Sequence, residues 1–67
     1  MKKITIGKNI KLIRVQNKLS QKEFGEKLGF SARTVSDWEC GNTEPDINTI
    51  KLIVRLFNIS YDELFDF

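Results

Sequence analysis

The chain contains no histidine, one cysteine, Cys40, and one proline, Pro45, in its 67 residues. Without histidine, Cys40 has no conventional base partner for nucleophilic chemistry. No spacing of ligand residues suits a metal ion, no carboxylate pair falls in a predicted cleft, and no glycine-rich phosphate loop follows a strand. These absences argue against an enzyme, and we expect no cofactor, no metal and no small-molecule substrate.

Long apolar runs are missing as well. No stretch approaches the length of a transmembrane span, and no secretory signal is present. A single cysteine cannot form an internal disulfide, which fits a reducing compartment. We therefore expect a cytoplasmic protein with no membrane contact. Because 67 residues have room for one thin core, residues 1–67 are expected to form a single domain.

Charge is distributed unevenly along the chain. Residues 1–33 hold nine Lys or Arg against two Glu, a net charge of +7, whereas residues 34–67 hold two against seven acidic residues, a net charge of −5. A basic half of this kind indicates a face that meets a polyanion. The alternative is that the lysines only solvate the first helix, and charge alone does not decide between the two.

Apolar spacing and capping residues predict an all-α chain of about five helices, with no strand pattern of useful length. Ser20 and Glu23 form a capping-box pattern at the start of the second helix. The same pattern recurs at Ser60 and Glu63. The expected helices run from about Ile6 to Asn17, Ser20 to Gly29, Ser31 to Glu39 or Cys40, Ile47 to Phe57, and through Tyr61, Leu64 and Phe65.

A projection at about 100° per residue sorts the apolar residues of the first and fourth helices into two sides. Leu12 and Val15 fall on the outer side of the first helix, and Leu52 and Leu56 on the outer side of the fourth. Scattered exposed apolar residues are common in proteins and need no function. The residues expected to face the core are Ile6, Ile10, Ile13, Ile47, Ile50, Ile53, Val54 and Phe57.

Residues 21–38, QKEFGEKLGFSARTVSDW, form the most informative segment. Gly29 ends one short helix, and Gly25 within that helix lets a second helix cross closely. Val35 and Trp38 return at helical spacing and form the buried side of the second helix. This pattern is typical of a helix-turn-helix, which presents its second helix to the DNA major groove. The residues left on the outer side are Ala32, Arg33, Ser36 and Asp37.

The side chains on this outer side suit the edges of bases. Arg33 can donate two hydrogen bonds to guanine, Asp37 can accept one from cytosine, and Ala32 offers a contact to a thymine methyl group. Ser31 and Thr34 lie near the helix start, where a phosphate can meet free backbone N–H groups. An ordinary surface helix also has a polar side, so the interpretation rests on the whole segment and not on this helix alone.

Three stretches resemble a known family: LSQKEFGEKLGFS, TVSDWECGNTEPD and, near the end, NISYDEL. At these spacings they resemble the Cro/C1-type helix-turn-helix family over about residues 6–64. The resemblance implies a five-helix, lambda-repressor-like DNA-binding domain with its helix-turn-helix at the second and third helices. It also implies double-stranded DNA as the partner.

The resemblance implies roles for single positions. Gln21 resembles a glutamine that hydrogen-bonds a DNA phosphate and supports the reading helix. Asn42 and Thr43 match a loop that contacts the phosphate backbone. Arg14 and Glu39 match positions that often pair within the domain.

Three positions depart from the family pattern. Asn42 stands where a basic residue is common, and Gly25 stands where alanine is common, at a cost in helix propensity. Asp37 turns a negative charge towards DNA, so it either makes a specific contact or is held off the groove by Arg33. These departures predict modest affinity for a single domain.

Two functions remain open on the sequence alone. The first is a sequence-specific regulator of transcription, expected to be a repressor that binds a two-fold operator as a homodimer, because one domain makes few contacts. The second is a protein-interaction module, antitoxin-like or sensing another protein. A candidate dimer surface consists of Leu52, Leu56, Tyr61, Phe65 and Phe67, with the alternative that the aromatic residues only cover the open end of the core.

Overall fold

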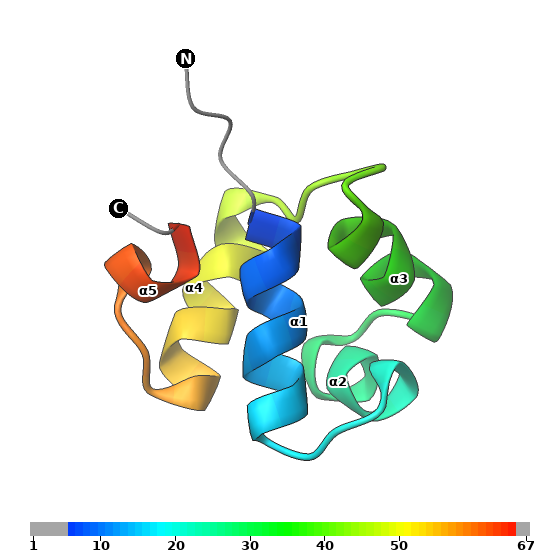
Figure 1. Cartoon of the computed structure of the whole chain (residues 1–67), viewed down its shortest axis with the longest axis horizontal. Helices are drawn as coiled ribbons and strands as arrows, with labels where there is room; N and C mark the ends of the chain where they lie inside the picture. Colours follow the sequence, from blue (N-terminus) through cyan, green and yellow to red (C-terminus); the bar gives the residue numbers. More distant parts are fainter. Residues whose placement is uncertain (1–5, 66–67) are drawn as a thin grey trace.

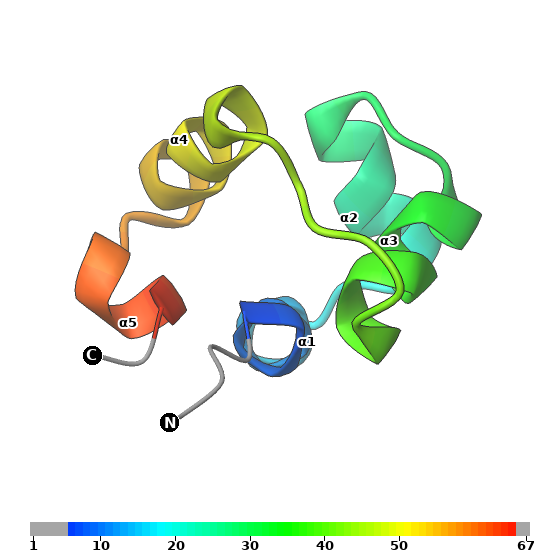
Figure 2. The same cartoon turned by 90° about the horizontal axis from the view of Figure 1, so that it is seen from above.

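A computed structural model describes residues 6–65, and these residues form five α-helices and no strand. α1 lies between two pairs of helices, with α2 and α3 on one side and α4 and α5 on the other (Figures 1 and 2). The all-α, five-helix prediction is confirmed. The bounds are Ile6–Gln16 for α1, Gln21–Leu28 for α2, Ala32–Cys40 for α3, Ile47–Phe57 for α4 and Tyr61–Phe65 for α5.

The helix ends follow from capping chemistry. At α2, the Ser20 hydroxyl accepts a hydrogen bond from the Glu23 backbone at 3.0 Å, and the Glu23 carboxylate accepts one from the Ser20 backbone at 2.8 Å. This second bond lowers the pKa of Glu23. Gly29 and Gly41 end α2 and α3 at φ angles of 85° and 81°, in the left-handed region that favours glycine.

The second capping box forms only in part. The Glu63 backbone N–H donates to the Ser60 hydroxyl at 3.1 Å, but the bonds of residues 6–65 do not include the reciprocal one from Ser60 to the Glu63 carboxylate. α5 is instead tied to α1, because the Asn9 side chain donates to the Leu64 backbone oxygen at 2.8 Å.

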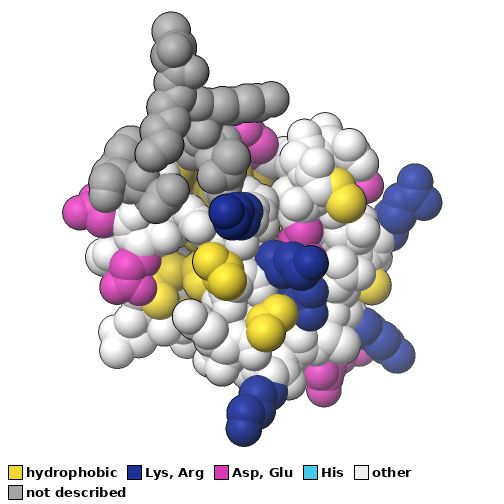
Figure 3. Space-filling view, viewed as in Figure 1, with side chains coloured by type: hydrophobic (Ala, Val, Ile, Leu, Met, Phe, Trp, Pro, Cys, Tyr) yellow, Lys and Arg dark blue, Asp and Glu magenta, His cyan; other side chains and the backbone are white. Residues whose placement is uncertain are grey.

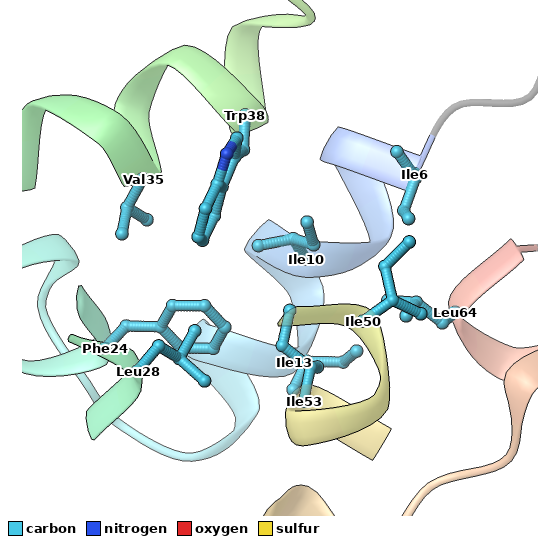
Figure 4. Close-up of a cluster of buried hydrophobic side chains, with 10 residues drawn as sticks. All are labelled: Ile6, Ile10, Ile13, Phe24, Leu28, Val35, Trp38, Ile50, Ile53 and Leu64. Carbon is cyan, nitrogen blue, oxygen red and sulfur yellow. The ribbon is translucent and has the colours of Figure 1, made fainter. Parts of the chain in front are cut away.

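All five helices contribute to one hydrophobic core, and Figure 4 shows their side chains converging. The Phe24 ring of α2 stacks on the Phe57 ring of α4, with ring centroids 5.2 Å apart and planes inclined by 10°. The buried apolar residues are Ile6, Ile10, Ile13, Phe24, Leu28, Val35, Trp38, Ile50, Ile53 and Leu64.

Two expectations about α4 are corrected. Ile47 was expected to face the core, but it is 58% exposed, because it lies roughly 120° around the helix from the fully buried Ile53. Leu52 was expected on the outer side, but it is partly buried and packs against the core. Leu12, Val15 and Leu56 are exposed, as predicted.

Two glycines allow backbones to approach closely. A β-carbon at Gly25 would collide with the Phe30 backbone oxygen, and one at Gly7 would collide with the Trp38 backbone oxygen. The first contact explains why glycine replaces the alanine common at position 25. The second contact, which was not predicted from the sequence, sets the distance between α1 and the end of α3.

Candidate nucleic-acid interface

The outer side of α3 is a polar surface on a firmly anchored helix. Val35 and Trp38 are buried beneath it, and the Trp38 ring meets the Phe30 ring edge-on at a centroid distance of 5.0 Å. The Arg33 side chain is 87% exposed. Ala32, Ser36 and Asp37 are partly exposed on the same helix. The structure therefore brings the four predicted base-facing residues together on a single helix of the helix-turn-helix.

Asp37 has two weak partners within the protein. One carboxylate oxygen lies 3.8 Å from the Arg33 Nε, and the same oxygen accepts a hydrogen bond from the Asn42 side chain at 3.5 Å. Both distances are at the long end of their range, and exposed pairs of this kind contribute little stability. Asp37 and Arg33 are thus only loosely paired within the protein.

The loop after α3 is fixed by its backbone. The Asp37 backbone oxygen accepts hydrogen bonds from the backbone N–H groups of Asn42, at 2.9 Å, and Thr43, at 3.4 Å. Both side chains remain exposed at the C-terminal end of α3. The link from the Asn42 side chain to Asp37 was not foreseen from the sequence.

Arg14, Gln21 and Glu39 join three helices. Arg14 Nε donates to Glu39 Oε2 at 2.6 Å and Arg14 Nη2 to Glu39 Oε1 at 3.2 Å, with the two side chains 13% and 5% exposed. The hydrogen bond to Glu39 raises the pKa of Arg14. Gln21 Nε2 donates to the same Glu39 Oε1 at 3.1 Å. The expected ion pair is present, and Gln21 contacts α3 through it.

The first turn of α3 holds the remaining polar residues. The Ser31 hydroxyl accepts from the Thr34 backbone N–H at 3.2 Å and lies 3.1 Å from the Thr34 hydroxyl. Ser31 is exposed and Thr34 is partly exposed. Their hydroxyls therefore lie together at the helix N-terminus, where backbone N–H groups favour an anion.

The candidate dimer surface lies on α4 and α5. Leu56 and Tyr61 are exposed, whereas Leu52 and Phe65 are partly buried against the core. Phe67 lies outside the described residues. Figure 3 looks onto α1 and shows Lys and Arg side chains over α1 and the α2–α3 side, with Asp and Glu side chains over α5 and also among the basic ones on the α2–α3 side.

Two further features are absent from residues 6–65. The Cys, Asp and Glu side chains in this range form no group of three that suits a metal ion. None of the helices in this range has the length and apolar character needed to cross a membrane.

Sequence comparisons point to one family. A family model described as helix-turn-helix matches residues 10–64. Antitoxin PezA of Streptococcus pneumoniae serotype 4 is 37% identical over 59 residues, which make up 88% of this chain and 37% of the antitoxin. The uncharacterized HTH-type transcriptional regulator YqaE of Bacillus subtilis is 35% identical over 58 residues, 87% of this chain and 50% of the relative. The chain thus spans half or less of the length of these relatives.

Solved structures show the same arrangement of helices. A transcriptional regulator from Listeria innocua superimposes with a TM-score of 0.85 at 27% identity, over 92% of this chain and 58% of the other. The P22 c2 repressor protein, crystallised in complex with a synthetic operator, superimposes with a TM-score of 0.81 at 26% identity, over 96% of each chain.

Proposed function

This chain belongs to the Cro/C1-type helix-turn-helix family and has the lambda-repressor-like fold, and from that premise we propose that it is a sequence-specific DNA-binding regulator of transcription, acting as a repressor. The observation that carries the proposal is the exposed polar side of α3. Arg33 projects from a helix that Val35 and Trp38 anchor in the core. α3 therefore suits insertion into a major groove.

Two groups of contacts have different tasks in this proposal. Base readout falls to Arg33, Ser36 and Asp37, with Ala32 against a thymine methyl group. Phosphate contacts fix the position of the domain without reading sequence. They are assigned to residues at both ends of the reading helix and at the start of α2, namely Gln21, Ser31, Thr34, Asn42 and Thr43.

A homodimer is the second part of the proposal. One domain with few cationic contacts binds weakly, and a two-fold operator doubles the contacts. Leu56 and Tyr61 are exposed and Leu52 and Phe65 partly so, and together they offer an apolar surface on α4 and α5. Phe67, also assigned to this surface from the sequence, is not among the described residues.

Selection from a random duplex library tests the proposal. Repeated binding and amplification is expected to enrich a two-fold sequence, and affinity for that duplex should fall steeply with salt as phosphate contacts release counterions. A scrambled duplex of equal length and composition is the control. Failure to enrich any sequence above the starting library would remove the proposed function.

A protein partner is the alternative, and one observation favours it. The relative PezA is named an antitoxin and shares 37% identity with this chain. Its chain is much longer than the part matched, so the likeness concerns this domain only. A domain that neutralises a protein partner can also bind DNA, so the two proposals are compatible. The family is not an enzyme class, and we propose no catalytic activity and a cytoplasmic place of action.

A further inference from the structure

Glu39 occupies a central position between the elements assigned to DNA contact. Its side chain is only 5% exposed, and it accepts hydrogen bonds from two other helices. One oxygen accepts from Arg14 of α1 at 2.6 Å. The other is shared between Arg14, at 3.2 Å, and the Gln21 amide of α2, at 3.1 Å. An ion pair alone needs only Arg14, so the bond to Gln21 is an additional feature.

We propose that Glu39 is a positioning residue for DNA binding: it orients the Gln21 amide so that this amide donates its second hydrogen to a phosphate. The proposal rests on the proposed function, because it assumes that Gln21 faces DNA. It assigns to Glu39 a role in recognition in addition to its role in stability.

The geometry of an amide explains the effect. A glutamine amide has two donor hydrogens in one plane and one acceptor oxygen. When one hydrogen is donated to Glu39 Oε1, the plane of the group is set and the direction of the second hydrogen follows. A free glutamine side chain would lose rotational freedom on binding a phosphate, and this one has lost much of it beforehand.

Glu39 can act in this way because it is itself held firmly. Arg14 donates two hydrogen bonds to it, and Arg14 Nη1 donates a third to the Leu19 backbone oxygen at 2.9 Å. Leu19 directly precedes Ser20, the cap of α2. Glu39 also lies near the C-terminal end of α3, two residues before Gly41. The same carboxylate thus links the start of α2 to the end of α3, where the loop of Asn42 and Thr43 begins.

Replacing Glu39 by glutamine separates the two roles of the carboxylate. The new amide has one oxygen, which Arg14 attracts, and an NH₂ group that then faces Gln21. Gln21 must rotate its own amide by half a turn so that two N–H donors do not face each other. After this rotation, its NH₂ group no longer points at the phosphate and cannot donate to it. The variant keeps the size of the side chain and removes one negative charge, a change that by itself strengthens DNA binding.

A double-mutant cycle tests the proposal by fluorescence anisotropy with the selected duplex. Gln21→Ala and Glu39→Gln are each expected to weaken binding by about three- to tenfold, the usual value of one hydrogen bond. The double variant is expected to bind no more weakly than either single variant, because both remove the same contact. Glu26→Gln, which removes an exposed charge from α2, is the control and should bind equally or more tightly.

Two results would overturn the proposal. If the losses from Gln21→Ala and Glu39→Gln add, or if Glu39→Gln binds as tightly as Glu26→Gln, Glu39 has only a structural role. If the unmodified chain selects no duplex at all, the proposed function and this inference fall together. Selective binding with additive losses removes this inference alone.

A thermal melt followed by circular dichroism shows whether the Glu39→Gln variant folds. If it does not fold, a second measurement on the unmodified chain tests the proposal. In the unmodified chain, NMR resolves the two side-chain amide protons of Gln21. One is expected to be protected from solvent exchange without DNA, and the other only when the duplex is added. Equal protection of both protons before DNA is added, or loss of the first on binding, would contradict the proposal.

Discussion

Gly7, in the first turn of α1, lies against the Trp38 backbone oxygen so closely that no β-carbon fits between them. Gly7→Ala improves helix propensity by about 1 kcal/mol, but it forces two backbones apart, and overpacking costs about 1–3 kcal/mol. Because the β-carbon would meet backbone and not a flexible side chain, we expect a net loss near the upper end of the difference, about 2 kcal/mol in the free energy of unfolding, measured by urea denaturation. Gln16→Ala, on an exposed position of the same helix, should be near neutral. Equal stability of the two variants would show that the backbones can separate at no cost.

Arg33→Ala tests the reading helix. Arg33 is assigned to guanine, so its removal should cost about 1–3 kcal/mol on the selected duplex and relax the preference at one or two base pairs. Arg55→Ala removes the same charge from an exposed position on α4 and is the control. Binding of duplexes with single base changes gives the measurement. An equal loss on every duplex would make Arg33 a phosphate contact.

Leu56→Glu tests the dimer surface. A charge placed in an apolar interface resists burial, so self-association should weaken, as measured by sedimentation equilibrium. Leu12→Glu is a matched control, because Leu12 is 51% exposed and Leu56 47%, and Leu12 lies on α1 outside the surface. An unchanged mass for Leu56→Glu, or the same shift in both variants, would rule out α4 as the interface.

Lys18 has a backbone conformation that suits glycine. Its φ angle is 58°, and it follows α1 at the point where the Leu19 backbone N–H closes the turn onto the Arg14 backbone oxygen at 3.1 Å. Lys18→Gly should raise the free energy of unfolding by about 0.5–1 kcal/mol, because it relieves left-handed strain that exceeds glycine's entropy cost. Asn58, at a φ angle of 53°, tolerates this region better, so Asn58→Gly should gain less. A gain for Asn58→Gly as large as that for Lys18→Gly would contradict this account.

Asp46 makes stability depend on pH. Hydrogen bonds from the Thr49 side chain and backbone lower the pKa of Asp46 in the folded chain. Its stabilising effect is therefore present above the unfolded pKa of about 3.9 and is lost as the pH falls through the folded pKa. Asp46→Asn keeps a capping side chain that does not titrate, so stability should decline less steeply below about pH 4.

The measurement for Asp46 is the free energy of unfolding from urea titrations at several pH values. Glu44→Gln, in the exposed loop before it, controls for the loss of one carboxylate. Equally shallow profiles for the two variants would show that the α4 cap is not the source of the effect.

Much of the fold was predictable because local chemistry sets the helix ends. The Ser20 cap, the left-handed Gly29 and Gly41, and the Asp46 cap are all readable as residue types, and the bounds of α4 agree with the prediction to the residue. The exposure of Ile47 and the partial burial of Leu52 could not be predicted from the sequence. Both lie at the flanks of the helix, where neighbouring helices decide which side is covered.

The candidate site was predictable in its residues but not in its internal contacts. A helical projection places Arg33 and Asp37 on one side of α3. It cannot show that Asn42 reaches Asp37, because that depends on how the chain turns after Gly41. The contact of Gly7 with Trp38 joins residues far apart in the sequence. A glycine within a helix does not reveal which backbone segment packs against it, so this contact could not be predicted.

Because the Arg14–Glu39 pair has low exposure, we expect salt to weaken contacts to DNA at concentrations that leave the fold of the domain stable. Mobile ions screen exposed charges over about 8–10 Å at physiological concentrations, whereas a partly buried pair such as this one is screened less. If the domain binds DNA as proposed, salt that releases it from the phosphate backbone is therefore expected to leave its three-helix junction assembled. In a salt titration of the proposed complex, we then expect the slope to reflect displaced ions and not unfolding of the domain.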